Sequence, residues 1–288
     1  MKIFKDRVAL VTGGASGIGY GMVQNFLQLG MKCVIVDFNA AYLEELRDAL
    51  RGRVDVHMVQ ADVGDRDQVR SAAQEAKRIF GRIHVLCNNA GIGGGGDTDD
   101  ADFDAWDKAL RVNLGGVVNC TKIIAPLIIS HGEGGHIVNT SSMAGLVPLP
   151  LPGLGAYQTA KFAVRGFTES LRMSMAAHGI GVSCLFPGGT RTRIIEAAAP
   201  DDAARAAVRQ MTASWMDPLE LGAKVVAGIR DNAPYILTHM EFRDEVRELY
   251  GMLDAAFPRD QEVPPGRGGF EARRRALVAE RRALPIKD

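Results

Sequence analysis

The chain has 288 residues, of which 34 are basic and 34 acidic, so its formal net charge at pH 7 is zero. A neutral chain offers no general attraction to nucleic acid or to an anionic membrane surface. Charges interrupt the opening segment MKIFKDRVALVTGG where a secretory signal needs an apolar core, and we see no window of ~18 apolar residues that could span a bilayer. We therefore expect a cytoplasmic protein with no nucleic-acid or membrane partner.

Short β-branched runs alternate with amphipathic segments, which is typical of parallel strands joined by crossover helices. The apolar runs that predict strands lie at residues 7–14, 32–38, 55–63, 83–91, 135–142, 181–189 and 234–239. Helices are predicted at about 17–29, 40–51, 65–80, 102–129, 156–178, 218–231 and 240–256. Because the strands are apolar on both faces, the sequence predicts an α/β fold: a Rossmann-type doubly wound, seven-stranded parallel sheet in three αβα layers, with a C-terminal helical extension.

The first functional signal is the segment TGGASGIG at residues 12–19, which closes the first strand and opens the first helix. Glycines there let the backbone turn tightly and approach a pyrophosphate, whose charge meets the free N–H groups of the helix N-terminus. Asp37 ends the second strand, where a carboxylate accepts hydrogen bonds from ribose hydroxyls and repels the extra phosphate of NADP. Ser16 and Phe38 supply no cation for that phosphate. This pattern predicts an NAD site, and the alternative is a structural glycine turn.

The second signal is the pair Tyr157 and Lys161, whose spacing of four residues places both on one face of a helix. A free tyrosine loses its proton near pH ~10, so a neighbouring cation is needed to make it a base at neutral pH. This spacing recurs by chance in many helices, but Ser142 stands fifteen residues before the tyrosine and the glycine turn lies upstream. Together these residues predict a hydride-transfer site.

These motifs, with NNAG at residues 88–91 and Asn113 in RVNLGGV, resemble the short-chain dehydrogenase/reductase superfamily over about residues 5–240. The resemblance implies an NAD-dependent oxidoreductase. Its implied catalytic residues are Asn113, Ser142, Tyr157 and Lys161. Its implied cofactor-binding residues are Gly13, Ser16, Gly17, Ile18, Gly19, Asp37, Phe38, Asp62, Val63, Asn89, Ala90, Gly91, Tyr157, Lys161, Pro187, Gly188, Thr190 and Thr192.

By this resemblance, Tyr157 as phenolate takes the proton of a secondary alcohol while the hydride passes to NAD. Lys161 lowers the pKa of Tyr157 and holds the nicotinamide ribose, and Asn113 holds a water that links Lys161 to solvent. Side chains alternate along a strand, so only one of Ser141 and Ser142 can face the substrate. The family pattern selects Ser142 as the donor to the substrate oxygen.

Three less regular segments bear on the substrate. The loop GLVPLPLPGL at residues 145–154 is apolar and stiffened by proline, so it can wall a hydrophobic pocket. Residues 93–96 are glycines that either leave room above the nicotinamide or form a flexible turn. Residues 193–216 stand where the family has its substrate lid. We expect a bulky, aromatic or benzylic alcohol. The alternatives are a hydroxysteroid or cyclic diol at the same site, or an NAD-binding sensor without turnover.

Two arginines are unusual for the family. Residues 187–192, PGGTRT, are similar to the family segment that binds the nicotinamide carboxamide. Arg191 and Arg193 either face solvent there or meet an acidic group of the substrate.

A single dinucleotide-binding and catalytic domain is expected at residues 1–257, with a Pro/Gly linker and basic helical tail at 258–288. Residues 267–288 hold seven basic and three acidic side chains, which suits a solvated helix that clasps a neighbouring subunit better than a nucleic-acid arm. The tail from residue 231 is similar to that of bacterial Cα-dehydrogenases of lignin-type aryl ethers, which implies a benzylic alcohol oxidised to an aryl ketone. The family resemblance further implies a homodimer or homotetramer.

No metal site is expected. The cysteines show neither CxxC nor Cys/His metal spacing, so they are read as buried thiols: Cys33, Cys87, Cys120 and Cys184. The histidines without ligand spacing are assigned structural or solvent roles: His84, His131 and His136. An acidic run precedes a helix, where carboxylates cap free N–H groups: Asp97, Asp99, Asp100, Asp102 and Asp104.

Overall fold

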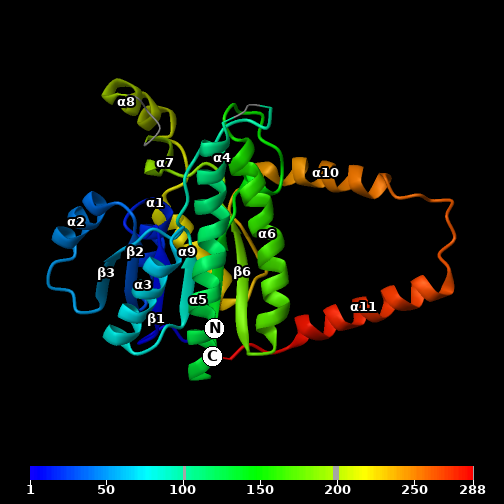
Figure 1. The fold of residues 1–288 in the computed structure, drawn as a ribbon, viewed down its shortest axis with the longest axis horizontal. Helices are drawn as coiled ribbons and strands as arrows, with labels where there is room; N and C mark the ends of the chain where they lie inside the picture. The colour runs from blue at the N-terminus through cyan, green and yellow to red at the C-terminus, as the bar shows by residue number, and fades with distance from the viewer. Residues whose placement is uncertain (100–101, 197–200, 288) are drawn as a thin grey trace.

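A seven-stranded parallel sheet forms the centre of the protein, in the order β3-β2-β1-β4-β5-β6-β7 (Figure 1). The computed structural model describes residues 1–99, 102–196 and 201–287. The strands are β1 (Val8–Thr12), β2 (Lys32–Asp37), β3 (Val56–Gln60), β4 (Val85–Asn88), β5 (Gly135–Thr140), β6 (Ile180–Phe186) and β7 (Tyr235–Leu237). Six of the strands lie within predicted apolar runs and β6 begins one residue before its run, so the predicted doubly wound α/β fold is confirmed.

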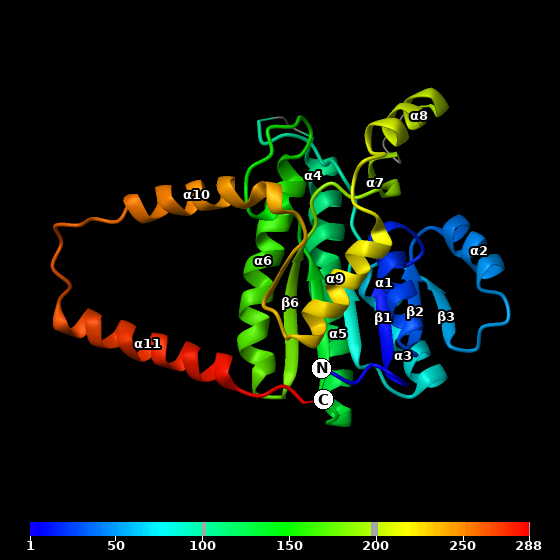
Figure 2. The same ribbon diagram turned by 180° about the vertical axis from the view of Figure 1, so that it is seen from behind.

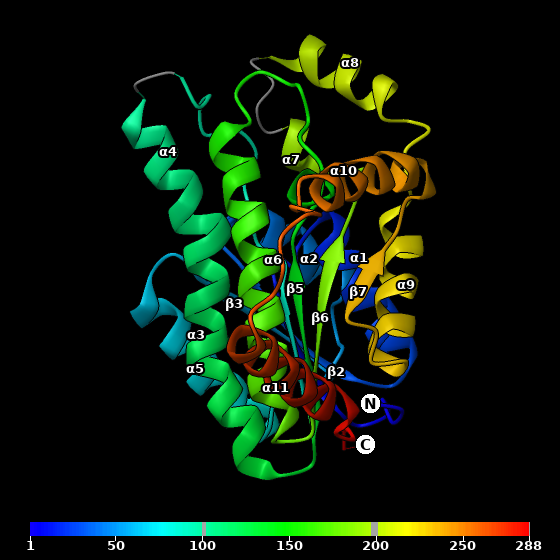
Figure 3. The ribbon, with the colours of Figure 1, turned by 90° about the vertical axis from the view of Figure 1, so that its right-hand side faces the viewer.

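Helices cover both faces of the sheet, as Figure 3 shows. The helices are α1 (Gly17–Gln28), α2 (Ala40–Ala49), α3 (Arg66–Phe80), α4 (Phe103–Leu110), α5 (Gly116–His131), α6 (Gly155–Ala176), α7 (Arg193–Glu196), α8 (Asp202–Met211), α9 (Pro218–Arg230), α10 (Arg243–Ala255) and α11 (Pro265–Ala283). One face is covered by α1, α2 and α9, and the other by α3, α5 and α6. These layers form the predicted three-layer arrangement.

The strand β1 shows why its first four positions, Val8 to Val11, are apolar. Ala9 and Val11 pack in the core beneath α1 and α9, whereas Val8 and Leu10 pack in the core beneath α3 and α5. Because successive side chains point to opposite faces, a strand between two helix layers buries both faces and favours apolar side chains on each.

The predicted helix at 102–129 is divided by a π-helical turn, Arg111–Gly115, between α4 and α5. Asp102 begins it, because its carboxylate accepts the Ala105 N–H at 3.0 Å. The capping role predicted for the acidic run is therefore confirmed at Asp102, while Asp100 lies outside the described residues.

The stretch Phe103–His131 corrects one expectation from the sequence. It contains an 18-residue window of mean hydropathy 1.6, long and apolar enough by composition to cross a membrane. Half of that window is buried inside the protein, where α5 packs on the sheet and α3. The stretch is a core helix of the domain.

The predicted structural role of two histidines has a clear physical basis. The Nδ1 of His84 accepts the Val8 N–H at 3.1 Å, and its Nε2 lies 3.0 Å from Glu133. The Nδ1 of His131 accepts the Glu133 N–H at 3.2 Å, and its Nε2 donates to Ile83 O at 2.9 Å. Although the three side chains lie together, both nitrogens of each ring already have protein partners. The cluster therefore links the segments at the starts of β1 and β4 to the turn that carries Glu133. All four cysteines are buried, as predicted.

The C-terminal extension leaves the domain. Figures 1 and 2 show α10 and α11 projecting to one side as an arm, with the chain returning to the domain at its end. The turn Met240–Phe242 leads into α10, and the last described residues follow α11.

Candidate active site

The glycine turn between β1 and α1 fits a bound pyrophosphate. Gly17 has a φ of +51°, which side chains rarely adopt, and a Cβ at Gly19 would lie 2.1 Å from Gly13 O. Ser16 precedes α1 without a side-chain capping bond, and the first helical turn carries no acidic residue. The first N–H groups of α1 therefore face the turn without a side-chain partner, which suits an anionic group.

The NNAG segment after β4 holds that turn in place. Asn89 donates through Nδ2 to Thr12 O at 3.1 Å and Gly13 O at 3.2 Å. The Thr12 hydroxyl in turn accepts the N–H groups of Asn89 and Ala90, at 3.0 and 3.1 Å. Asn88 donates to Asn139 at 2.7 Å, which joins β4 to β5. This network is built at the point where the strand order reverses between β1 and β4, the usual ligand position in such sheets.

Two acidic residues lie at the adenosine end predicted for the cofactor. The Asp37 carboxylate accepts the N–H of Ala15 at 3.1 Å and the N–H of Asn39 at 3.0 Å. Phe38 beside it is 70% exposed and supplies no charge. The Asp62 carboxylate accepts the Gly64 N–H at 2.8 Å and pairs with Arg111 at 2.8 Å.

Val63, next to Asp62, is buried against Gly116, where a Cβ would lie 2.5 Å from the valine side chain. Its side chain therefore packs in the core and helps to position the loop after β3.

Asn113 lies in the π-helical turn and is completely buried. Its Oδ1 accepts the Ile92 N–H at 3.1 Å, and its Nδ2 donates to Ile92 O at 3.0 Å. A Cβ at Gly91 would lie 2.7 Å from Asn113 Oδ1 and 3.5 Å from Lys161 Nζ. Gly91 therefore approaches these two polar groups too closely for any side chain at that position.

The two adjacent serines point in opposite directions. Ser141 is buried and donates to Lys161 O at 2.7 Å, so its hydroxyl ties β5 to α6. Ser142 turns the other way, where its hydroxyl accepts the Ala144 N–H at 3.1 Å and hydrogen-bonds the phenol of Tyr157. Lys161 lies one helical turn after Tyr157, with Nζ 5.4 Å from the ring centroid. The structure thus brings Ser142, Tyr157 and Lys161 together.

The electrostatics of this group differ from the sequence-based expectation. Burial raises the pKa of Tyr157, and only the Ser142 hydrogen bond acts in the opposite direction. Burial also lowers the pKa of Lys161 to about 8, and its Nζ donates to Thr140 O at 3.0 Å. In the protein alone, Lys161 is not among the groups that lower the pKa of Tyr157, and desolvation has the largest effect on it.

The segment after β6 closes over the glycine turn. A Cβ at Gly17 would lie 3.0 Å from Thr192 Cγ2, so these two segments are in contact. Pro187 O accepts the Met143 N–H at 2.9 Å, which links the segment to the Ser142 loop. Thr190 is buried and donates to Gly188 O at 3.1 Å.

His239 is a site residue that the sequence motifs did not reveal. Its Nδ1 accepts the Gly188 N–H at 3.0 Å, and its Nε2 lies 3.0 Å from Gly189 O. A Cβ at Gly188 would come within 2.6 Å of this ring, and one at Gly189 within 3.0 Å of Trp215. The Pro187–Gly188–Gly189 backbone is therefore held between a histidine and a tryptophan. The only sequence signal was a single histidine after the last strand.

Arg191 and Arg193 have partners within the chain. Arg191 pairs with Asp217, and Arg193 pairs with Glu45 at 3.0 Å while its guanidinium lies 4.4 Å from the Tyr42 ring. All four charged side chains are partly exposed. These surface ion pairs favour the solvent-facing alternative over contact with an acidic substrate.

An apolar cluster lies beside Ser142. Met143, Leu146 and Val147 are buried there with Phe186 of β6. On the outer side, the start of α10 packs against them through Phe242, Val246 and Leu249. The start of the predicted apolar loop, Leu146 and Val147, therefore packs inside this cluster, and the C-terminal extension packs against it.

The glycine segment and the lid region are ordered as specific turns and helices. Gly94, Gly95 and Gly96 all have positive φ, and a Cβ at Gly95 would lie 2.5 Å from Ala109. These glycines therefore shape a tight turn. The predicted lid at 193–216 contains α7 and α8, which the sequence analysis did not predict, and residues 197–200 of it lie outside the described residues.

The pattern of residues matches a known family. A model of the short-chain dehydrogenase family matches residues 7–203. Over 287 residues the chain is 31% identical to the C alpha-dehydrogenase of Sphingobium sp., covering 94% of this chain and 93% of that protein.

Solved structures agree with this match. A short-chain dehydrogenase from Novosphingobium aromaticivorans superposes with a TM-score of 0.82 at 34% identity, covering 96% of this chain and 98% of that one. A short-chain dehydrogenase/reductase from Burkholderia phymatum, crystallised with NAD, gives 0.79 at 30% identity, covering 92% and 100%. The chain therefore belongs to the short-chain dehydrogenase/reductase family of oxidoreductases, with a likeness to the lignin Cα-dehydrogenases.

Proposed function

We propose that the protein is an NAD-dependent dehydrogenase that oxidises a bulky secondary alcohol of benzylic type to a ketone. The observation that carries this proposal is the meeting of Ser142, Tyr157 and Lys161 beside the glycine turn. A purely structural cluster has no need to bury an amine whose pKa falls to about 8. The name of the Sphingobium relative, a C alpha-dehydrogenase, also fits oxidation at an alcohol carbon.

In this mechanism the phenolate oxygen of Tyr157 takes the hydroxyl proton of the substrate, and Ser142 donates a hydrogen bond to the same substrate oxygen. Lys161 is protonated at neutral pH because its pKa of about 8 still lies above 7. Burial raises the pKa of Tyr157, so the phenolate needs more positive charge than Lys161 provides. The oxidised nicotinamide, when bound, accepts the hydride and supplies that additional charge.

Asn113 acts by position. Its side chain bonds both the N–H and the carbonyl oxygen of Ile92, so it keeps residue 92 and the neighbouring Gly91 in place. Asn113 and Lys161 both lie near Gly91, and a water held beside them would carry a proton from the lysine toward solvent.

The proposed preference for NAD rests on two features of the cofactor site, one at the pyrophosphate and one at the adenosine ribose. The uncapped start of α1 suits the pyrophosphate, and Asp37 is held at the end of β2 by the N–H groups of Ala15 and Asn39. A fixed carboxylate there favours two ribose hydroxyls and repels a 2′-phosphate. The NAD complex of the Burkholderia neighbour supports the same choice.

The expected substrate class follows from the apolar cluster beside Ser142. Met143, Leu146 and Val147 are buried inside the cluster, so the partly buried residues packed against it, Leu149 and Phe242, are the ones that offer apolar contact rather than hydrogen bonds. An aryl group next to the alcohol carbon fits such a surface better than a sugar does. We further propose that residues 1–257 are the catalytic unit, with a lid at about 193–216, and that the protein acts in the cytoplasm as a homodimer or homotetramer.

Absorbance of NADH during incubation with matched alcohols tests this proposal. The panel holds a benzylic alcohol beside an aryl ether, a hydroxysteroid and a cyclic diol, each with NAD and with NADP. The benzylic alcohol with NAD should give the highest kcat/KM. Turnover of only the steroid or the diol would favour that alcohol as the substrate instead of the benzylic one. NAD binding without turnover of any alcohol would indicate an NAD-binding sensor rather than an enzyme.

A further inference from the structure

The arm, defined as residues 240–287, is tied to the domain at both ends. Phe242 and Val246 at its start pack on the apolar cluster beside Ser142. At its end, Lys287 donates its backbone N–H to Gly179 O at 2.9 Å, and its side chain packs over Gly179. Figures 1 and 2 show α10 and α11 held apart between these anchors, outside the domain. The arm therefore has a fixed position but no cover over its outer part.

The helix α10 carries an apolar stripe beside an acidic face. Leu253 and Phe257 continue the stripe beyond the domain edge and are 55% and 70% exposed. Glu241, Glu245 and Glu248 stand four and three residues apart, so they share a neighbouring face. Among the described residues, none of these three glutamates forms an ion pair, whereas Asp244 on another face pairs with Arg247. Four acidic and two basic side chains give α10 a net charge of −2.

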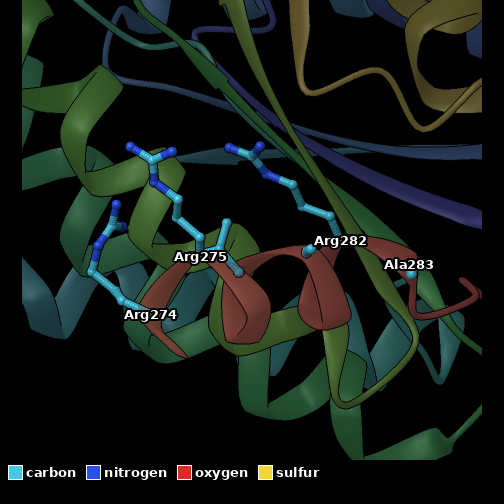
Figure 4. Close-up of a pocket in the computed structure, with 6 residues that line it drawn as sticks. Arg274, Arg275, Arg282 and Ala283 are labelled. Atoms are coloured by element: carbon cyan, nitrogen blue, oxygen red, sulfur yellow. The ribbon is translucent and has the colours of Figure 1, made fainter. Parts of the chain in front are cut away.

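The helix α11 repeats this arrangement with the opposite sign. Phe270 and Leu277 stand seven residues apart on one side and are 64% and 61% exposed. Arg267, Arg275 and Arg282 share an adjacent face with Val278 and Arg274. Figure 4 shows the guanidinium groups of Arg274, Arg275 and Arg282 projecting to the same side of the helix. Six arginines and two glutamates give α11 a net charge of +4.

Helices with such stripes need a partner. Isolated helices of this length are marginal in water, and most of their stability comes from covering an apolar face. Exposed apolar stripes flanked by charge are typical of helices that pair with another helix, with the flanking charges setting the choice of partner.

We propose that the arm binds the arm of a second copy of this chain, with α10 of each subunit against α11 of the other. A two-fold axis makes both contacts at once, because each copy supplies one acidic and one basic helix. Leu253 and Phe257 of one copy then cover the stripe of Phe270 and Leu277 on its partner. The acidic face of α10 meets the arginine face of α11 across the pair.

This partner fits the charges better than a nucleic acid does. A phosphate backbone would be attracted to α11 but repelled by the acidic helix beside it. The arm of a second copy offers each helix a partner helix of opposite charge. Because α10 begins on the apolar cluster beside Ser142, the pairing also fixes one side of the candidate substrate site.

Two full-length charge-reversal variants test the proposal. The first carries Glu241→Arg, Glu245→Arg and Glu248→Arg, so both of its helices are basic. The second carries Arg267→Glu, Arg275→Glu and Arg282→Glu, so both are acidic. Each variant alone should self-associate at least about tenfold more weakly than the wild type in sedimentation velocity. An equimolar mixture should regain association, because each subunit then meets helices of opposite charge.

The control carries the same charge change elsewhere, as Arg51→Glu, Arg70→Glu and Arg78→Glu on exposed sites at α2 and α3. It should associate as the wild type does. Circular dichroism identifies any variant that has not folded, and the single reversals Glu248→Arg and Arg282→Glu then replace it. Wild-type association by both variants, or a mixture no different from its components, would overturn the proposal. The readout is independent of catalysis.

Discussion

The side-chain ammonium of Lys161 donates a 3.0 Å hydrogen bond to the carbonyl oxygen of Thr140, two residues before Ser142. This bond ties α6, which carries Tyr157 and Lys161, to the end of β5. Lys161 is only 4% exposed, and burial lowers its pKa to about 8. A buried cation of this kind costs stability, so its presence is better explained by chemistry than by folding.

Lys161→Met should therefore change the pH dependence of stability. The pKa falls from 10.5 in the unfolded chain to about 8 in the fold. The unfolded state then binds more protons, so the cost of burying Lys161 is fully present below about pH 8 and is lost as the pH rises through 10.5. Between about pH 7 and about pH 10 the wild type should gain about 2 kcal/mol relative to the methionine variant. Urea unfolding of both proteins measures this, and parallel pH profiles would refute it.

Ser142→Ala should lower kcat by about 10²–10³-fold, the usual loss when one donor to a reacting oxygen is removed. The affinity for NAD should stay unchanged, because Ser142 faces the phenol of Tyr157. Ser141→Ala is the matched control, since its hydroxyl bonds to Lys161 O instead. That variant should lose about 1 kcal/mol of stability and less activity than Ser142→Ala. Equal losses of kcat in the two variants would contradict the assigned directions.

Asp37→Ala should weaken NAD binding and relax the discrimination against NADP. The change removes the carboxylate held by Ala15 and Asn39, and with it the repulsion of a 2′-phosphate. The ratio of Kd values for NADP and NAD, measured by calorimetry, should fall by at least about tenfold. Asp62→Ala is the comparison, because its carboxylate is paired with Arg111 and should affect the two cofactors alike. An unchanged ratio for Asp37→Ala would show that another group sets the preference.

His239 should position the segment that receives the nicotinamide. His239→Asn keeps an acceptor near the Gly188 N–H, and His239→Gln keeps a donor near Gly189 O. Both should weaken NAD binding by several-fold, about 3 to 10, and His239→Leu by more. ADP-ribose, which lacks the nicotinamide, should bind all three variants like the wild type. Calorimetry with both ligands separates the outcomes, because equal weakening of ADP-ribose would indicate general damage.

The sequence predicted the strands well because a parallel sheet between two helix layers buries both faces of a strand and favours apolar runs, as Val8 to Val11 show. It did not predict the π-helical turn at Arg111–Gly115. The residue types there suit an ordinary helix, and the two bonds between Asn113 and Ile92 come from a different segment. Such a contact exists only once the chain is folded.

The sequence predicted which residues form the candidate site better than it predicted their pKa values. The motifs identified Ser142, Tyr157 and Lys161, which the structure brings together. The burial that raises the pKa of Tyr157 in the protein alone was not predicted, because sequence spacing carries no measure of how deeply the phenol lies. His239 escaped notice because its role requires the end of β7 to meet the turn after β6.

Formation of NADH by wild type and by Tyr157→Phe, at saturating NAD and on one benzylic alcohol, tests the central claim most directly. The variant keeps the aromatic ring but loses the hydroxyl that Ser142 contacts. We predict that kcat falls by at least about 10³-fold while the Kd for NAD changes little. A variant that still oxidises the alcohol at a rate near that of the wild type would contradict the assignment of Tyr157 as the base.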